Sequence, residues 1–212
     1  MSQELRGILQ DGLREVGLDA PSGACDRVLA YAALLQKWNQ AYNLTGIRDP
    51  LASLRLNILD SLVMLPWCNG SSLADIGTGA GLPGIPLAIF RPDLKVLLID
   101  SNSKKTRFMF QAKTELGLDN VTVWQGRVED YASGAQVAIV TSRAFASLAD
   151  FVRASRHLLA PSGVFLAMKG QYPRDEIDAL PAGFRVSAVH ALRVPGVAAE
   201  RHLVEITADP AP

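Results

Sequence analysis

The chain has 212 residues, 49% of them hydrophobic, and 21 basic residues balance 21 acidic ones to a formal net charge of zero. A chain of this size can bury one sizeable core. Zero net charge excludes a basic coat over the whole surface but leaves room for a local basic patch. No apolar run reaches the roughly 18 residues of a membrane span, and the charged N-terminus lacks the apolar core of a signal peptide. We therefore expect a cytoplasmic, monomeric protein without membrane attachment.

The cysteines and histidines do not indicate a metal or disulfide framework. The two cysteines, Cys25 and Cys68, are too few for a disulfide scaffold, and their spacing does not match a metal site. The three histidines do not cluster along the chain either. We expect free thiols and no metal.

Residues 1–70 are expected to form a helical cap packed on the remainder of the chain. Apolar residues recur at helical spacing in two stretches, Leu5, Ile8, Leu9, Leu13 and Val16, and then Val28, Leu29, Ala32, Leu35 and Trp38. A third helix is predicted from about residue 51 to residue 65, because Asp49-Pro50 can start it and Pro66 can end it. No linker rich in Pro, Gly or Ser follows.

From residue 71 to 212 short apolar segments alternate with helical ones. The predicted strands are 72–76, 94–100, 121–126, 136–142, 163–170, 184–192 and 201–208, and the predicted helices are 82–90, 103–117 and 148–159. Apolar strands separated by helices are typical of a parallel sheet covered on both faces. The last two strands follow each other without a helix and are expected to pair antiparallel. The fold class is therefore α/β, with a mostly parallel seven-stranded sheet and an antiparallel C-terminal strand.

The stretch LADIGTGAGLPG (residues 73–84) contains the pattern G-x-G-x-x-G at the end of the first predicted strand. Gly77, Gly79 and Gly81 permit a sharp turn and a close approach of the backbone to a ligand. Asp100 ends the next strand about 20 residues later, where a carboxylate can accept from a ribose hydroxyl. These features suit a dinucleotide and S-adenosylmethionine equally well.

Three details favour S-adenosylmethionine. Asp75 lies two residues before the first glycine, where it would repel a pyrophosphate but tolerate a cationic sulfonium or amino group. Pro83 removes an amide donor that a phosphate cradle would use. Glu129 and Asp130 follow the third strand, where an acid can read an adenine amino group. This ordered set is typical of class I, Rossmann-like methyltransferases.

Simpler interpretations of the same residues remain open. Asp75 could be a helix N-cap or turn residue, Asp100-Ser101 could cap the helix that begins at Ser103, and Glu129 could be a solvated surface acid.

The sequence TSRAFA (residues 141–146), at the tip of the fourth strand, limits the kinds of methyl acceptor that the site could serve. It lacks the Asn/Asp-Pro-Pro motif used for exocyclic amines, and no cysteine is near for covalent attack on a pyrimidine. An acceptor atom that carries a lone pair and no proton would need no general base. Arg143 could then contact the cofactor or position the acceptor base. The alternative is a structural ion pair between Arg143 and Asp75 or Asp100.

Basic residues on the predicted helix 103–117 and on the later strands are candidates for RNA contact. Lys104, Lys105, Arg107 and Lys113 could form a phosphate-binding strip, although a solvated helix face explains each of them alone. Lys169 and Arg201 are the further candidates, and Lys169 could equally face solvent.

Nearly the whole chain resembles one family, the bacterial 16S ribosomal RNA guanine-N7 methyltransferases, RsmG or GidB. The resembling stretches are KWNQAYNLTGI (37–47), NILDSL (57–62), LADIGTGAGLPGIPLAI (73–89), LLIDSNSKKTRF (97–108), GRVEDY (126–131), VTSRAFASL (140–148) and MKG (168–170). The resemblance implies that S-adenosylmethionine is the methyl donor, with S-adenosylhomocysteine as product, and that 16S ribosomal RNA or the small ribosomal subunit is the substrate. One departure is Asn57, where the family is expected to prefer histidine.

Motif and resemblance together give the expected cofactor site: Asp75, Gly77, Thr78, Gly79, Gly81, Leu82, Asp100, Ser101, Val128, Glu129 and Arg143. The expected reaction is methyl transfer to N7 of a guanine by in-line displacement, with Arg143 in a positioning role. The alternatives are a methyltransferase for a small molecule or protein, an NAD-linked oxidoreductase, and an RNA-binding module without catalysis.

Overall fold

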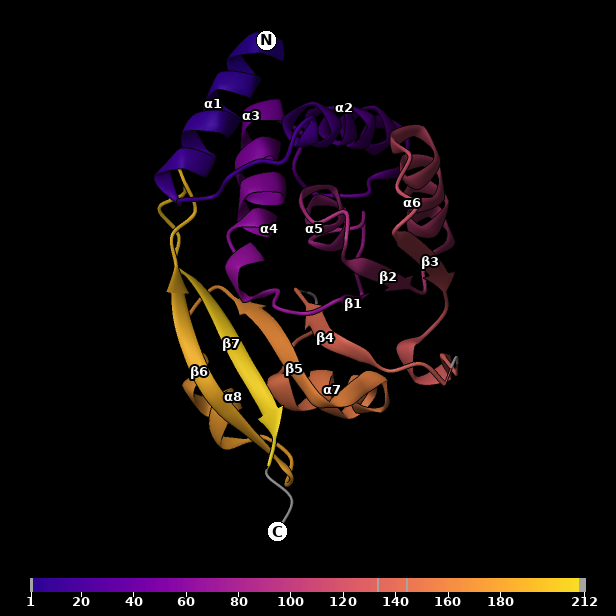
Figure 1. Cartoon of the computed structure of the whole chain (residues 1–212), viewed down its shortest axis with the longest axis vertical. Coiled ribbons are helices and arrows are strands. Elements are labelled where there is room, and N and C mark those ends of the chain that lie inside the picture. The colour runs from indigo at the N-terminus through magenta and orange to yellow at the C-terminus, as the bar shows by residue number, and fades with distance from the viewer. Residues whose placement is uncertain (1, 133, 144, 210–212) are drawn as a thin grey trace.

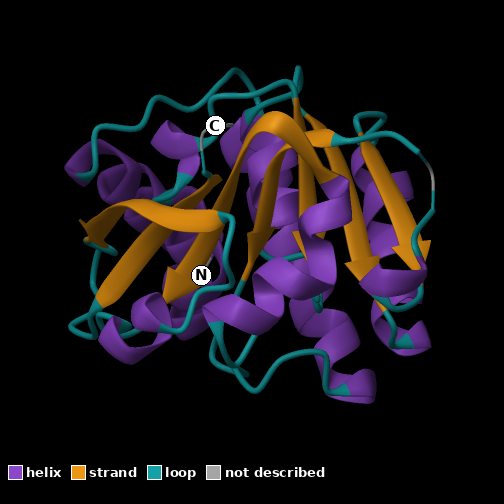
Figure 2. Cartoon of the chain, turned by 90° about the horizontal axis from the view of Figure 1, so that it is seen from below, coloured by secondary structure: helices purple, strands orange, loops and turns teal. Residues whose placement is uncertain are grey.

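The computed structural model describes residues 2–132, 134–143 and 145–209. Within these ranges seven strands form one twisted sheet, which Figure 2 shows with its strands side by side. The strands are β1 (Ser72–Ile76), β2 (Lys95–Asp100), β3 (Val121–Gln125), β4 (Val137–Ser142), β5 (Leu159–Lys169), β6 (Phe184–Leu192) and β7 (Arg201–Ala208). All seven predicted strands are confirmed.

The strand order is β3-β2-β1-β4-β5-β7-β6. Strands β1 to β5 pair in parallel, and β7 runs antiparallel to both β5 and β6. The predicted mostly parallel sheet with an antiparallel C-terminal strand is therefore confirmed. The order reverses direction between β1 and β4, and in open α/β sheets ligands bind at such a switch point, beyond the carboxyl ends of the strands.

The first 70 residues are helical, as predicted. They form α1 (Ser2–Glu15), α2 (Ala24–Tyr42) and a continuous third helix made of α3 (Pro50–Ser53), η1 (Leu54–Leu59) and α4 (Asp60–Leu62), followed by the short turn η2 (Leu65–Trp67). Asp49 caps this third helix by accepting from the Ala52 amide at 2.7 Å. Its middle part, η1, is a π-helix, a rare form that is found frequently at functional sites.

The remaining helices connect the strands. They are α5 (Gly84–Phe90), α6 (Ser103–Leu116), α7 (Leu148–Ser155) and α8 (Arg174–Asp178), with single turns η3 (Val128–Asp130) and η4 (Arg156–Leu158). The predicted helices 82–90, 103–117 and 148–159 are confirmed. Helix α8 and the turn η3 were not predicted, because neither is long enough to show a helical repeat of apolar residues.

Two apolar clusters cover the two faces of the sheet. Successive side chains of β2 point alternately into the two clusters. Val96 and Leu98 belong to the cluster with α5 and α6, whereas Leu97 and Ile99 belong to the cluster with α7. Figure 1 shows α5 and α6 on one side of the sheet and α7 and α8 on the other. The first cluster also takes in the N-terminal helices, and the buried Tyr31 hydroxyl of α2 donates to the Ala80 carbonyl at 2.6 Å. The N-terminal helices therefore share one core with the sheet.

Among the described residues, no helix has the length and apolar character to cross a membrane. Cys25 and Cys68 are both free thiols.

Candidate active site

The glycine loop follows β1 at the switch point of the sheet. Gly77 and Gly79 both have φ 64° and Gly81 has φ 89°, values in the left-handed region that side chains other than glycine rarely adopt. The amides of Gly77 and Thr78 donate to the Ile99 carbonyl at 2.9 and 3.2 Å, which ties the loop to the end of β2. The predicted sharp turn is therefore present, and the glycines are required by its backbone.

Asp75 supports this loop from behind. Its side chain is completely buried, and its Oδ2 atom accepts from the Thr78 hydroxyl at 2.6 Å and from the Gly84 amide at 2.8 Å, at the start of α5. Its Oδ1 atom has no hydrogen-bond partner among the described residues. Burial raises the pKa of Asp75 to about 7. These hydrogen bonds agree with the interpretation of Asp75 as a turn residue, whereas the N-cap of α5 is Pro83.

The raised pKa predicts a pH dependence of stability. Below pH 4 Asp75 is neutral in both states, whereas between about pH 4 and pH 7 the folded state holds a proton that the unfolded state has lost. This contribution to the free energy of unfolding is therefore lost as pH rises from about 4 to about 7, by about 1.4 kcal/mol per unit of pKa difference, and stays constant above pH 7. Urea unfolding at pH 5 to 8 should show wild type losing stability relative to Asp75→Asn as pH rises. Parallel pH profiles would contradict the assignment.

Asp100 joins the glycine loop to α6. Its Oδ2 atom accepts from the Gly79 amide and its Oδ1 atom from the Asn102 amide, both at 2.8 Å, and Lys105 Nζ lies 3.9 Å from Oδ2. The N-cap of α6 is Asn102, whose side chain accepts from the Lys104 amide at 2.9 Å. The alternative that Asp100-Ser101 merely caps this helix is therefore wrong.

A pocket of about 310 Å³, here called the cofactor pocket, lies beside this loop. It is lined by Ile76, Gly77, Ile99, Asp100, Ser101, Lys105, Gly126, Arg127, Val128, Glu129 and Phe145. Five of the predicted cofactor residues therefore meet at one site. Thr78, Gly79, Gly81 and Leu82 build the adjoining loop and do not line this pocket. Lys105, predicted to contact RNA, lines the cofactor pocket, and Phe145 was missed as a site residue although it lies in the stretch VTSRAFASL.

The cofactor pocket suits a nucleoside with an amino-acid tail. A Cβ atom built on Gly79 would meet only Lys105 Nζ, at 3.9 Å, so the backbone there presents an open surface. Asp100 and Glu129 supply carboxylates after β2 and β3, where ribose hydroxyls and an adenine amino group need acceptors. These residues fit S-adenosylmethionine, whose sulfonium carries the electrophilic methyl group.

A second pocket, about 320 Å³, is here called the arginine pocket. Its lining residues are Ile47, Leu56, Asn57, Asp60, Arg143, Met168, Lys169, Gly170 and Arg201. Arg143 Nη1 lies 3.0 Å from Asp60 Oδ2, and Arg201 Nε lies 2.7 Å from Asp60 Oδ1. The prediction that a structural Arg143 would pair with Asp75 or Asp100 is wrong, because its carboxylate partner is Asp60. Sequence reasoning missed Asp60, although it lies in the NILDSL motif.

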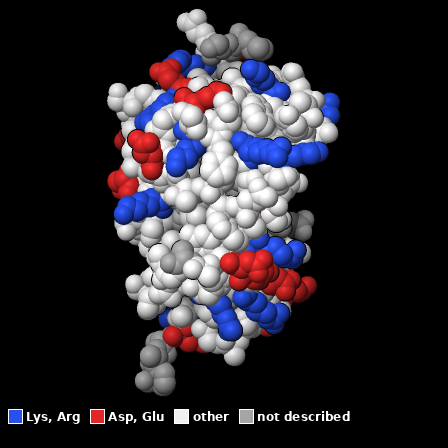
Figure 3. Space-filling model, turned by 90° about the vertical axis from the view of Figure 1, so that its right-hand side faces the viewer, with Lys and Arg blue, Asp and Glu red and all other residues white. Residues whose placement is uncertain are grey.

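The other residues predicted to contact RNA lie in different places, and only two of them, Lys169 and Arg201, line the same pocket. Lys169 forms an ion pair with Glu176 at 2.7 Å and donates to the Phe145 carbonyl at 3.3 Å, so it organises this segment rather than facing solvent. Lys104 and Arg107 are exposed on α6. On the side seen in Figure 3, basic residues are interspersed with acids and uncharged surface and do not form a continuous strip. Arg201 lines the arginine pocket.

Asn57, the departure from the expected family pattern, is buried on η1. Its side-chain amide donates to Ser53 Oγ at 3.0 Å, and its backbone carbonyl accepts from the Ser61 hydroxyl at 2.5 Å. It thus fixes the helix that carries Asp60, and it lines the arginine pocket.

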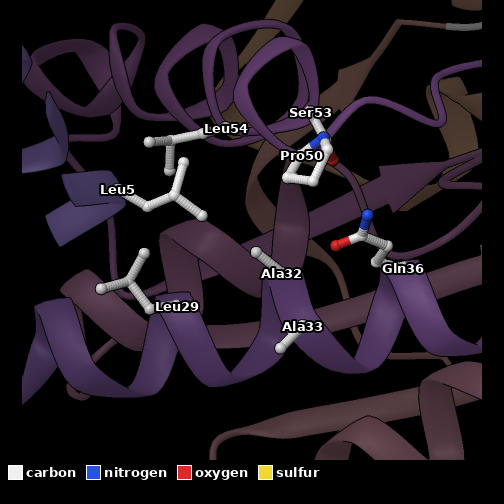
Figure 4. A pocket seen from close by; sticks show the side chains of 8 residues that line it. All are labelled: Leu5, Leu29, Ala32, Ala33, Gln36, Pro50, Ser53 and Leu54. Carbon is white, nitrogen blue, oxygen red and sulfur yellow. The ribbon is translucent and has the colours of Figure 1, made fainter. Parts of the chain in front are cut away.

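Two other recesses lie away from these pockets. Figure 4 shows an apolar one of about 160 Å³ between the N-terminal helices, lined by Leu5, Leu29, Ala32, Ala33, Gln36, Pro50, Ser53 and Leu54. It has no charged lining residue, so it does not suit a cofactor with a carboxylate and a ribose. A recess of about 710 Å³ lies at the opposite edge of the sheet, at the start of β1, β2 and β4. Ligands of such sheets bind at the carboxyl edge instead.

Comparison with solved structures identifies the fold. The chain is similar to a glycopeptide N-methyltransferase, MtfA, complexed with S-adenosylhomocysteine (TM-score 0.62, 13% identity, covering 72% of this chain and 90% of that one). It is also similar to TrmN from Thermus thermophilus (TM-score 0.58, 18% identity, 82% and 53% covered). At these identities the likeness shows the fold alone, which is that of class I S-adenosylmethionine-dependent methyltransferases.

Comparison of sequences gives the family. Residues 24–204 match the model of GidB, rRNA small subunit methyltransferase G. A relative of that name from Aromatoleum aromaticum is 54% identical over 201 residues, covering 92% of this chain and 95% of its own length. Another, from Marinobacter nauticus, is 50% identical over 198 residues, with 93% and 92% covered. This chain belongs to the rRNA small subunit methyltransferase G family, is an S-adenosylmethionine-dependent methyltransferase, and is not an NAD-linked oxidoreductase.

Proposed function

We propose that the protein transfers the methyl group of S-adenosylmethionine to N7 of a guanine in small-subunit ribosomal RNA. The observation that carries this proposal is the arginine pocket, where Asp60 pairs with both Arg143 and Arg201. The short segment after β4 connects it to the cofactor pocket, since Phe145 lines one pocket and Arg143 lines the other. A methyl donor in the first pocket would therefore lie next to a base in the second.

The residues of the arginine pocket suit an acceptor without a proton. Asp60 is committed to two guanidinium groups and Lys169 to Glu176, so neither is set to act as a general base. Guanine N7 offers its lone pair directly, and holding it in line with the methyl group can contribute about 7–11 kcal/mol through proximity. Arg143 would donate to guanine O6 and leave N7 open. Asp60 offsets part of the arginine charge while the base becomes cationic.

The target guanine is expected in an irregular part of the RNA. N7 lies in the major groove, which is deep and narrow in A-form RNA and closed to side chains. The base must therefore come from a loop or be splayed out of the helix. Since the net charge is zero, RNA shape would matter more than general phosphate attraction.

Asp75, Gly77, Thr78, Gly79, Gly81, Leu82, Asp100, Ser101, Val128 and Glu129 are proposed to hold the cofactor, by contact or by supporting the loop. We further propose residues 1–70 as a helical cap on the methyltransferase domain 71–212. The protein would act as a monomer in the cytoplasm, where ribosomal RNA is assembled.

Transfer of a radiolabelled methyl group tests the substrate class. Deproteinised small-subunit ribosomal RNA should become labelled in proportion to enzyme, whereas a mixture of metabolites and bulk protein should not. The reverse pattern would favour the alternative of a small-molecule or protein methyltransferase.

A further inference from the structure

Asp60 occupies an unusual position between two arginines from distant parts of the chain. Arg143 follows β4 and Arg201 begins β7, whereas Asp60 begins α4 in the N-terminal helical region. The Asp60 side chain is 7% exposed, and each of its two oxygen atoms pairs with one guanidinium, at 3.0 and 2.7 Å. One buried carboxylate therefore pairs with both guanidinium groups of the arginine pocket.

The third helix is built to hold Asp60 in this place. The preceding segment η1 is π-helical, and the Asp60 amide donates to the Arg55 carbonyl, five residues earlier. Asn57 lies one turn before Asp60 and bonds to Ser53 and Ser61 on either side of it. This helix packs against α5, which follows the glycine loop. The carboxylate is thus anchored to the same core as the cofactor pocket.

We propose that Asp60 is a positioning residue for methyl transfer, holding Arg143 and Arg201 in the arrangement that receives the target guanosine. A guanidinium has five N–H donors in a rigid plane, so one ion pair to Asp60 fixes that plane without using all the donors. This inference rests on the proposed role of the arginine pocket, and it assigns part of the catalytic arrangement to the N-terminal helices.

Two possible roles of Asp60, setting the local charge and positioning the arginines, predict opposite results for the rate of the Asp60→Asn variant. The two arginines and Asp60 together carry one positive charge, and neutralising Asp60 raises this to two. If attraction of RNA phosphates were all that mattered, Asp60→Asn would bind ribosomal RNA more tightly and react at least as fast. If Asp60 positions the arginines, the same variant reacts more slowly although its affinity for RNA is maintained or increased.

The test compares Asp60→Asn, Asp60→Glu and a matched control, Asp93→Asn. Asp93 pairs with Arg91 at 2.6 Å on the opposite edge of the sheet and provides an Asp–Arg pair outside the cofactor and arginine pockets. We expect kcat for small-subunit ribosomal RNA to fall at least tenfold in Asp60→Asn, with unchanged affinity for S-adenosylhomocysteine. Asp60→Glu keeps the charge but displaces the carboxylate, and an error of about 1 Å in position can cost up to a hundredfold in rate. Asp93→Asn should react like wild type.

A kcat of Asp60→Asn and Asp60→Glu within twofold of wild type would overturn the inference. It would also be overturned if the loss of kcat were matched by an equal loss of cofactor affinity, since Asp60 would then have only a structural role. Wild-type enzyme that fails to methylate ribosomal RNA would instead contradict the proposed function, so the two failures are distinguishable.

Discussion

Replacing Gly77 with aspartate is expected to abolish cofactor binding while leaving the fold intact. Gly77 has φ 64° and lines the cofactor pocket, so we expect the new side chain to intrude on the space proposed for the cofactor. The left-handed backbone conformation alone costs about 1–2 kcal/mol of stability. We expect the affinity for S-adenosylhomocysteine, measured by calorimetry, to fall more than a hundredfold and methyl transfer to be lost.

Gly117→Asp is the matched control for this variant. Gly117 has φ 61° at the end of α6, and a Cβ atom built there meets no heavy atom within 4 Å. It therefore carries the same backbone strain outside the pocket. The two variants should lose similar stability, and only Gly77→Asp should lose the ligand. Equal ligand affinity in both variants would show that the cofactor does not occupy this crevice.

Replacing Arg143 with alanine is expected to lower kcat for ribosomal RNA by about a hundredfold to a thousandfold, the usual cost of removing one donor that stabilises the transition state. Arg143 lines the arginine pocket and is absent from the lining of the cofactor pocket. The affinity for S-adenosylhomocysteine should therefore change little. Steady-state kinetics on ribosomal RNA, with ligand binding measured separately, distinguishes the two effects.

Arg91→Ala controls for the loss of an arginine that pairs with an aspartate, because Arg91 pairs with Asp93 at the opposite edge of the sheet. It should retain wild-type kcat. If Arg143→Ala lost cofactor affinity and rate in the same proportion, Arg143 would belong to the cofactor site, and the proposed guanine contact would be wrong.

Most of the fold could be predicted because each strand is a short apolar run bounded by polar or glycine-containing turns. The cofactor pocket could also be predicted, since its residues follow successive strands and the carboxyl ends of parallel strands meet at one edge. Helix α8 and the π-helical segment η1 could not, because five or six residues do not display a period. The third helix itself was predicted from its Asp49-Pro50 start.

The arginine pocket could be predicted only in part. Arg143 and Arg201 were singled out from sequence, but their shared partner was not. Asp60 lies 83 residues from Arg143 and 141 residues from Arg201 along the chain, and spacing carries no information about contacts of that kind. Lys105 illustrates the same limit. From sequence, a lysine on an exposed helix face cannot be distinguished from one that lines a cofactor pocket.

Guanine N7 is the atom at which we propose that the methyl group is received. The direct measurement is to incubate small-subunit ribosomal RNA lacking the modification with the enzyme and S-adenosylmethionine, and then to identify the methylated nucleoside by mass spectrometry and its position by borohydride–aniline cleavage, which acts at 7-methylguanosine. We expect 7-methylguanosine at a single guanine in a loop or irregular region. Methylation at another atom, or label spread over many positions, would contradict this proposal.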